Sequence, residues 1–259
     1  MMDEERFGGI GRLYGTPAAE RISAARVAVV GIGGVGSWAA EALARSGVGT
    51  LILMDLDDIC ITNTNRQIEA TEGAYGRSKA EVMAERVRTI NPAAQVVPLM
   101  HFYSAKHPER LFDTRPDVVV DAIDDMHPKA HLIAACRERG VPVVTCGGAG
   151  GRVDAACITV ADLARTHHDN MLVQLRKELR KDYGFPLEDK CPEIGIPCVY
   201  SPERPRFPRC DGSVSAEREP GTPAKLGCAA GYGSATHVTG TFGFMAAGAA
   251  LQIITQSQP

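Results

Sequence analysis

Hydrophobic and polar positions along the first 160 residues form blocks typical of a parallel β-sheet with crossover helices. A β-branched run over residues 27–30 leads into a glycine cluster, a helical spacing of apolar residues over 37–46 and an apolar run over 51–54. Uninterrupted apolar runs predict strands that are buried on both faces. This segment therefore predicts a β-α-β unit, whose crossover is right-handed almost without exception.

The same rhythm continues further along the chain. It predicts helices over residues 78–90 and 128–139, and strands over 95–99, 117–123 and 141–146. Alternating strands and helices favour an α/β fold with a doubly wound, Rossmann-like, mostly parallel sheet.

After residue 151 the rhythm breaks, and residues 153–160 could form one more strand. Asp169 is a suitable N-cap for a helix over residues 170–182. Residues 184–225 are rich in proline and glycine, and they predict long, mobile loops with short strands such as 198–201. The C-terminal part is therefore expected to be an extension of loops, short strands and helices.

Composition narrows the class of protein. The 259 residues are 44% hydrophobic and 23% charged, which excludes disorder over most of the chain. The 28 basic and 31 acidic residues give a net charge of -3, so any nucleic-acid site must be local. Eight cysteines are too few for a disulfide scaffold, and residues 1–15 do not resemble a signal peptide. We expect a cytoplasmic protein with reduced thiols.

The C-terminal tail is unusual because residues 226–259 contain no Asp, Glu, Lys or Arg. Residues 235–255 are long enough, at about 20 residues, to cross a bilayer. However, they include several threonines and are heavy in glycine and alanine, and no Lys or Arg cluster flanks them. We favour a buried helix that covers the sheet or a dimer interface over a membrane anchor.

The glycine cluster has the GxGxxG pattern between a predicted strand and a predicted helix, and its glycines are Gly31, Gly33, Gly34 and Gly36. Such glycines allow backbone amides to approach a phosphate at the helix N-terminus. Asp55 follows Gly36 by 19 residues, at the end of the next strand. A carboxylate in this position can bind a ribose hydroxyl, so the pattern predicts a nucleotide site.

Residues beyond that strand favour ATP over NAD. They supply acids, amides and two cations, namely Asp57, Asn63, Asn65, Arg66 and Lys79. Arginine and lysine suit the oxygens of a triphosphate. Asp124, at the carboxyl end of the strand over 117–123, is expected to hold Mg²⁺.

Together with Arg12, these residues resemble the adenylating superfamily of ubiquitin-activating enzymes and their bacterial relatives of the ThiF and MoeB type, over residues 6–150. The resemblance implies that ATP:Mg²⁺ is bound and that a carboxylate attacks the α-phosphate. The products are an acyl-adenylate and pyrophosphate. It also implies one domain, with residues 6–161 as the nucleotide-binding core and 162–259 as an extension for substrate and dimer contacts.

The resemblance also assigns roles to residues. It implies that Asp55 binds the ribose and that Asp124 coordinates Mg²⁺. It implies that Asn63, Arg66 and Lys79 contact the phosphates. Arg12 would reach the triphosphate from the partner subunit of a homodimer.

Later stretches are similar to a narrower group, the tRNA threonylcarbamoyladenosine dehydratases. They comprise residues 121–125 with 128–130, 144–151, 198–201 with Glu203, 228–236 and 239–244. This resemblance implies ATP-dependent cyclisation of threonylcarbamoyladenosine next to the anticodon of tRNA. The threonyl carboxylate would be adenylated, and an internal nitrogen would then displace AMP.

Two other function classes remain as alternatives. One is an adenylyltransferase for the C-terminal glycine of a sulfur-carrier protein, a group that typically binds zinc through two CxxC pairs. The late cysteines, Cys191, Cys198, Cys210 and Cys228, form no CxxC pair, so we expect no zinc. The other is a non-catalytic nucleotide-binding scaffold, which the set of Arg12, Arg66, Lys79 and Asp124 disfavours.

Several further expectations concern partners and thiols. The resemblance implies a cysteine desulfurase system as partner, which leaves Cys228 as a candidate sulfur-relay thiol or a buried structural one. Cys60, Cys136, Cys146 and Cys157 lie in or beside apolar runs and are expected to be buried. Carbonyls of residues 147–151 would permit a monovalent cation, K⁺ or Na⁺.

Two basic segments are candidates for contacts with the tRNA backbone. They contain Arg176, Lys177, Arg180 and Lys181 in the first and Arg204, Arg206, Phe207 and Arg209 in the second. The alternative interpretation is a solvated helix face and a mobile loop.

Overall fold

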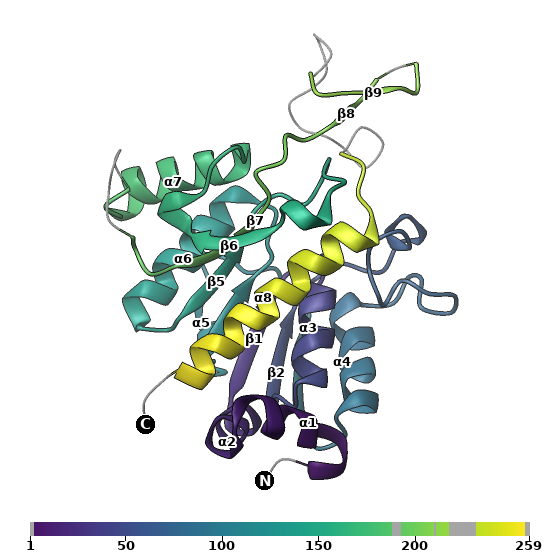
Figure 1. Ribbon diagram of the computed structural model, residues 1–259, viewed down its shortest axis with the longest axis vertical. Helices are drawn as coiled ribbons and strands as arrows, with labels where there is room; N and C mark the ends of the chain where they lie inside the picture. Colours follow the sequence, from purple (N-terminus) through teal and green to yellow (C-terminus); the bar gives the residue numbers. More distant parts are fainter. Residues whose placement is uncertain (1–2, 188–192, 210, 218–231, 257–259) are drawn as a thin grey trace.

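The computed structural model describes residues 3–187, 193–209, 211–217 and 232–256 (Figure 1). Seven strands form one sheet in the order β3-β2-β1-β4-β5-β7-β6. Their bounds are β1 (Arg26–Val30), β2 (Thr50–Met54), β3 (Gln95–Leu99), β4 (Val118–Asp121), β5 (Val143–Cys146), β6 (Thr159–Asp162) and β7 (Pro197–Tyr200). Neighbouring strands are parallel except β6 and β7. The predicted doubly wound, mostly parallel sheet is confirmed.

Helices cover both faces of the sheet. Their bounds are α1 (Glu4–Tyr14), α2 (Thr16–Ala24), α3 (Gly36–Arg45), α4 (Lys79–Ile90), α5 (Glu109–Phe112), α6 (Met126–Arg139), α7 (Asn170–Tyr183) and α8 (Thr236–Gln256). The helices α3, α4 and α8 pack on one face, and α5, α6 and α7 pack on the other. Figure 1 shows α1 and α2 at the end of the sheet where β1 begins.

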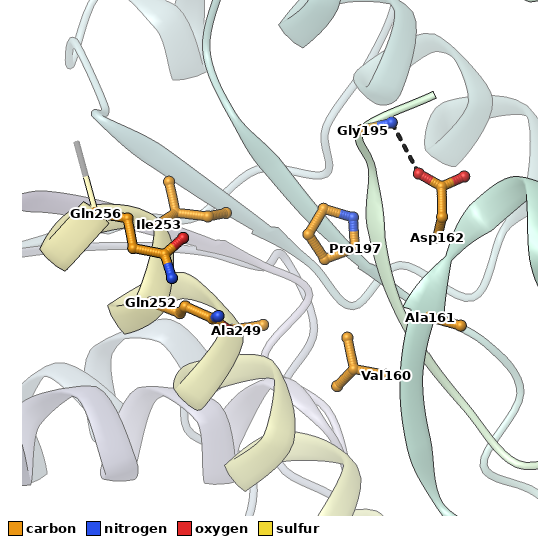
Figure 2. Close-up of a pocket in the computed structure, with 9 residues that line it drawn as sticks. All are labelled: Val160, Ala161, Asp162, Gly195, Pro197, Ala249, Gln252, Ile253 and Gln256. Atoms are coloured by element: carbon orange, nitrogen blue, oxygen red, sulfur yellow. Dashed lines mark hydrogen bonds between the residues drawn. The ribbon is translucent and has the colours of Figure 1, made fainter. Parts of the chain in front are cut away.

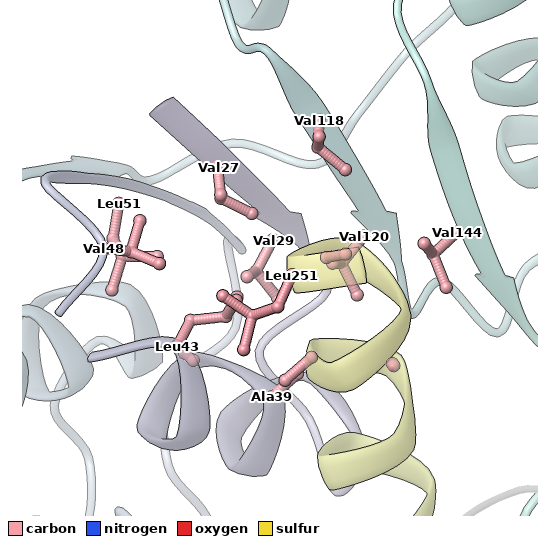
Figure 3. Close-up of a cluster of buried hydrophobic side chains, with 14 of the residues drawn as sticks. Val27, Val29, Ala39, Leu43, Val48, Leu51, Val118, Val120, Val144 and Leu251 are labelled. Atoms are coloured by element: carbon pink, nitrogen blue, oxygen red, sulfur yellow. The ribbon is translucent and has the colours of Figure 1, made fainter. Parts of the chain in front are cut away.

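Each central strand contributes alternate residues to two hydrophobic cores. Val27 and Val29 of β1 face α3 and α8, whereas Ala28 and Val30 face the opposite layer with α6. Figure 3 shows the first of these cores, with Leu251 of α8 among the strand valines. This two-sided burial explains why the strands appear in the sequence as uninterrupted apolar runs.

The chargeless tail forms α8, which lies diagonally across α3 and the central strands (Figure 1). A Cβ at Gly243 would lie 2.6 Å from the carbonyl oxygen of Val35 and 2.7 Å from Cβ of Trp38, so the two helices touch backbone to backbone. By length and composition alone α8 could cross a membrane, but 61% of its most apolar window is buried inside the structure. The predicted buried helix that covers the sheet is confirmed.

One prediction about local structure is wrong. The strand predicted over residues 153–160 is instead a 3₁₀ turn (Ala155–Cys157) followed by the short strand β6. Asp154 caps this turn by accepting from the amide of Ala156, and Glu203 binds the amides of Val153 and Asp154. These side-chain contacts remove the donors that a strand would have used.

The N-terminal helices were not predicted, although α1 begins with Asp3 as its N-cap and has Glu4 and Glu5 in its first turn. The bounds of the other predicted elements differ from the predicted ones by at most two residues at either end. In the segment 184–225, the described residues form β7 and a small hairpin of β8 (Phe207–Pro208) and β9 (Val214–Ser215). Figure 1 shows this hairpin beyond the body of the molecule, near the start of α8.

Candidate nucleotide and adenylation site

The predicted glycine loop connects the carboxyl end of β1 to the N-terminus of α3. Gly31 has a φ of +90°, and a Cβ there would lie 2.8 Å from the carbonyl oxygen of Ala122. A Cβ at Gly36 would lie 1.7 Å from the carbonyl oxygen of Gly31. Neither position can hold a side chain, so the loop brings its backbone close to the segment after β4. This is the geometry that a phosphate-binding loop requires.

Asp55 braces this loop from the end of β2. Its carboxylate accepts from the amide of Ile32 at 2.6 Å and from the amide of Asp57 at 2.9 Å. Burial raises the pKa of Asp55 above its ordinary value, whereas the amide of Asp57 and the charge of Lys79 lower it. A carboxylate has lone pairs beyond these two bonds, so Asp55 retains the capacity to accept from a ribose hydroxyl.

Lys79 places a buried cation beside Asp55. It is the first residue of α4, and its ammonium lies 2.8 Å from a carboxylate oxygen of Asp57. The Lys79 side chain is 9% exposed, whereas that of Asp57 is 53% exposed. The pair thus lies at the protein surface, with most of the lysine side chain inside the protein.

Arg66 lies over the glycine loop, following a 3₁₀ turn (Ile61–Asn63). Its side-chain carbons approach to 3.2 Å from a Cβ built on Gly34, and its Nη1 donates to the carbonyl of Thr62 and to the side chain of Asn65. The indole N–H of Trp38 donates to the backbone carbonyl of Arg66 at 3.0 Å. The guanidinium has five N–H donors, so it keeps donors for a ligand.

The two predicted asparagines hold this turn in place. Asn63 is buried, and its side-chain oxygen accepts from the amide of Cys60 at 2.9 Å. The side-chain nitrogen of Asn65 donates to the carbonyl of Ser234 at 2.7 Å, and the hydroxyl of Thr236 donates back to the Asn65 carbonyl. The start of α8 is thereby bonded to the segment that carries Arg66.

Asp124 is exposed in the turn after β4 and is the predicted metal ligand. A buried network fixes this turn. Lys129 of α6 binds a carboxylate oxygen of Asp121 at 2.8 Å and donates to the carbonyl of Ile123 at 3.0 Å. The hydroxyl of Thr145 donates to the same Asp121 oxygen at 2.6 Å. The exposed carboxylate of Asp124 therefore belongs to a turn whose backbone is held in place, next to the glycine loop.

The structure does not bring Arg12 to this site within one chain. Arg12 is an exposed residue in the last turn of α1, which lies at the edge where the strands begin. The glycine loop lies at the opposite edge, where β1 and β4 end (Figure 1). Any contact of Arg12 with the site must therefore come from another subunit.

Buried polar groups that the sequence did not single out surround the same loop. Ser37, Gln67 and Glu69 each have a buried side-chain oxygen with no hydrogen-bond partner in the described part of the chain. Gln67 and Glu69 lie one and three residues after Arg66, so their nearness in sequence to the predicted site was visible. Their burial was not visible, because residue type alone does not predict it.

The glycine turn after β5 is built around Asp169. A Cβ at Gly147 would lie 2.6 Å from a carboxylate oxygen of Asp169, which accepts from the amide of Gly148 at 2.9 Å. The other oxygen caps α7, as predicted. The buried guanidinium of Arg152 lies 3.4 Å from Asp169 and donates to the carbonyl of Gly148.

The cysteine predictions are partly wrong. Cys136, Cys146 and Cys198 are buried, and burial raises the pKa of Cys146 to about 12. Cys60 is exposed and Cys157 is only half-buried, because both lie in turns beyond the ends of strands. Cys191, Cys210 and Cys228 lie outside the described residues.

The two basic segments differ in availability. Arg176 is half-buried and donates to Thr166 and to the carbonyl of Leu163, so it supports the local fold. The other cations are exposed: Lys177, Arg180 and Lys181 on α7, and Arg204, Arg206 and Arg209 beside the β8–β9 hairpin. In the hairpin segment, Phe207 packs against Tyr232 with ring centroids 5.2 Å apart.

A groove of about 350 Å³ lies elsewhere, between β6, Pro197 and the last turns of α8 (Figure 2). Its one acid, Asp162, already accepts from the amides of Ile194, Gly195 and Ile196. None of the predicted site residues lines it. The groove is therefore separate from the nucleotide site.

This chain is similar to known proteins along nearly its whole length. The model of the ThiF family matches residues 10–259. A tRNA threonylcarbamoyladenosine dehydratase of Escherichia coli is 47% identical over 96% of this chain and 92% of its own length. A protein of the same name from Haemophilus influenzae is 46% identical over 94% and 90%, respectively. The crystal structure of the E. coli dehydratase in complex with ATP superposes with a TM-score of 0.84 at 44% identity, covering 97% of this chain and 94% of that one.

Proposed function

Because this chain belongs to the ThiF family and, within it, to the tRNA threonylcarbamoyladenosine dehydratases, we propose that it uses ATP to cyclise threonylcarbamoyladenosine in tRNA. The observation that carries the proposal is the convergence of the glycine loop, Asp55, Arg66 and Lys79 at one edge of the sheet. The similarity to dehydratases spans nearly the whole chain, including the extension beyond residue 161.

The reaction needs activation because a carboxylate is a poor electrophile. An oxygen of the threonyl carboxylate attacks the α-phosphorus of ATP, and the bond to pyrophosphate breaks. An internal nitrogen of the modified nucleoside then attacks the acyl carbon, loses its proton and displaces AMP. The net result is a ring and the loss of one water from the nucleoside, at the expense of ATP. No protein nucleophile is required, so the site acts by positioning and charge.

The predicted residues around the glycine loop have different roles in this proposal. Asp55 accepts from the ribose, and the amides of the glycine loop meet the phosphates. Arg66 and Lys79 neutralise the negative charge that leaves with pyrophosphate, and Asn63 and Asn65 hold the turn that carries Arg66.

Mg²⁺ fits the turn after β4. Mg²⁺ prefers oxygen ligands and is commonly held by one or two carboxylates together with substrate phosphates. Asp124 supplies an exposed carboxylate there, with its backbone fixed by Lys129. Bound at Asp124, Mg²⁺ would neutralise phosphate charge.

We also propose a homodimer in which Arg12 of one subunit completes the site of the other. The position of α1, at the edge of the sheet opposite the glycine loop, supports this arrangement, since a contact within one chain is out of reach (Figure 1). Leu13, next to Arg12, is 73% exposed, and Ile61, beside the site, is 67% exposed. Contact between subunits would cover such apolar side chains.

The tRNA would meet the protein through exposed cations. The β8–β9 hairpin, beside Arg204, Arg206 and Arg209 in the sequence, lies near the start of α8 (Figure 1). The amide of Arg206 donates to the carbonyl of Gly151, whose amide donates to the carbonyl of Gly233 just before α8. Since the start of α8 is bonded to Asn65, this segment lies on the side of the nucleotide site. Lys177, Arg180 and Lys181 form a second candidate patch on α7. A cytoplasmic location, a cysteine desulfurase partner with Cys228 as relay thiol, and a monovalent cation at residues 147–151 stay predictions. At that turn the carbonyl of Gly148 already accepts from Arg152.

Nucleoside mass spectrometry tests the function directly. Purified protein with Mg²⁺ and ATP should convert threonylcarbamoyladenosine in tRNA to a product lighter by one water. Omitting ATP should leave the nucleoside unchanged. If no water is lost, and pyrophosphate exchange appears only with a small carrier protein ending in glycine, the alternative adenylyltransferase reading replaces this one. The absence of CxxC pairs favours the dehydratase.

A further inference from the structure

Glu69 is a buried carboxyl that no described residue satisfies. It is 2% exposed, and neither carboxyl oxygen has a hydrogen-bond partner in the described part of the chain. The hydroxyl of Ser37, in the first turn of α3, lies near enough to lower the pKa of Glu69, although it makes no hydrogen bond of ordinary geometry. A buried ionised carboxylate without donors is costly. Stability of the fold therefore does not explain why an acid occupies this position.

The charges around Glu69 are unbalanced. Lys79 faces it from the start of α4, and Asp55 faces it from the end of β2. The ammonium of Lys79 is already paired with Asp57 at 2.8 Å, so one cation serves three carboxyls. Burial raises the pKa of Glu69 from 4.5 to about 7, against the lowering influences of Ser37 and Lys79. The group therefore exchanges a proton near neutral pH.

A triphosphate would worsen this imbalance. The glycine loop leads into the turn of α3 that carries Ser37, so phosphates bound at this loop would add negative charge close to Glu69. Like charges disfavour the ionised form of an acid. We infer that Glu69 takes up a proton when the phosphates of ATP enter the pocket, so that the chain binds ATP and a proton together. This inference rests on the proposed ATP site.

The protonated form also suits the surrounding groups. A neutral carboxyl has an O–H donor, which the ionised form lacks. The side-chain oxygen of Gln67, two residues away, is a buried acceptor with no hydrogen-bond partner in the described part of the chain. Proton uptake thus removes a buried charge and supplies a donor at the same moment.

Calorimetry measures the proton directly. Mg²⁺-ATP is titrated into the full-length protein at about one pH unit above the Glu69 pKa, in two buffers with different ionisation enthalpies. The wild type should take up as much as about one proton per ATP, and its affinity should fall by up to about tenfold per pH unit as the pH rises above 7. The Glu69→Gln variant should take up fewer protons per ATP than the wild type, by about the number assigned to Glu69. Its affinity for ATP should lack the fall that Glu69 causes above pH 7. Any proton that ATP itself gains or loses on binding contributes equally to both titrations, so it cancels when the two proteins are compared.

Glu72→Gln is the matched control, since it removes the same charge three residues away at an exposed position. It should retain the proton uptake of the wild type. Equal uptake in the wild type and Glu69→Gln overturns the inference, as does a wild-type affinity that is independent of pH above 7, a measurement that needs no variant. A wild type that does not bind Mg²⁺-ATP at all overturns the proposed function instead.

Discussion

Lys129 and Asp121 form an ion pair at 2.8 Å in which neither side chain is exposed. The pair joins α6 to the end of β4, and Lys129 also holds the carbonyl of Ile123, one residue before Asp124. Burying two charges is costly, and the cost is met only while both partners are present. The pair therefore fixes the turn that carries Asp124. Loss of either partner is expected to lower the free energy of unfolding strongly.

Replacing Lys129 with methionine should be strongly destabilising. It leaves the Asp121 carboxylate buried, with Thr145 and the amide of Ile123 as its remaining donors among the residues that the structure describes. Removal of one partner of a buried pair costs about 3 to 5 kcal/mol, which denaturant unfolding can measure. Lys106→Met removes an exposed lysine and should change the free energy of unfolding by less than about 0.5 kcal/mol. Equal losses in the two variants would refute the proposed penalty.

Glu69→Gln should stabilise the protein in alkaline but not in acidic solution. The folded-state pKa of about 7 exceeds the ordinary value of 4.5, so the folded state binds the proton more tightly. Stability from this group is complete below about pH 4.5 and is lost as the pH rises to about 7, by about 3 kcal/mol in total. The variant should therefore unfold at a higher temperature than the wild type at about pH 8. Parallel stability–pH profiles for the two proteins would contradict this account.

Lys79→Ala and Asp124→Ala should abolish turnover while leaving a folded protein. Lys79 supplies a cation beside the glycine loop, and Asp124 is an exposed carboxylate at the end of β4. Dehydration of the nucleoside, followed by mass spectrometry, measures the loss, and circular dichroism checks the fold. Asp125→Ala changes a neighbouring exposed acid and serves as the control for Asp124. Turnover at the wild-type rate in either site variant would refute its assigned role.

More of the fold than of the site could be predicted from the sequence. Strands such as β1 and β2 are buried on both faces, so their apolar runs are visible in the sequence. The glycine loop was visible for a similar reason, because close backbone contact excludes side chains at Gly31 and Gly36. Both features leave a direct mark on residue type, because buried strands need apolar residues and close backbone contacts need glycine.

Features that depend on burial of polar residues could not be predicted. A lysine at position 129 and a glutamate at position 69 are ordinary surface residues by type, yet both are buried. The first helix was missed since Gly8, Gly9 and Gly11 weaken helical propensity, which Asp3 and the acidic first turn offset.

Mixing of subunits tests whether Arg12 acts across the dimer. Arg12→Ala and Asp124→Ala chains should each be inactive alone. In a heterodimer isolated through two different tags, one of the two sites contains Asp124 and receives Arg12 from the other chain. Such a heterodimer should recover about half of the wild-type rate. No recovery in a heterodimer that is folded and binds ATP would show that Arg12 does not complete the partner's site.

A final prediction concerns the contact between α8 and α3. Gly243→Ala should destabilise the protein by about 1 to 3 kcal/mol, because the added Cβ would lie within 2.8 Å of backbone atoms of Val35 and Ala39. Gly248→Ala, in the same helix, adds a Cβ that meets nothing within 4 Å. It should stabilise by about 0.5 to 1 kcal/mol through helix propensity. Opposite signs in thermal unfolding would show that α8 is held by close packing on α3, whereas equal effects would show that small residues at this contact are not required.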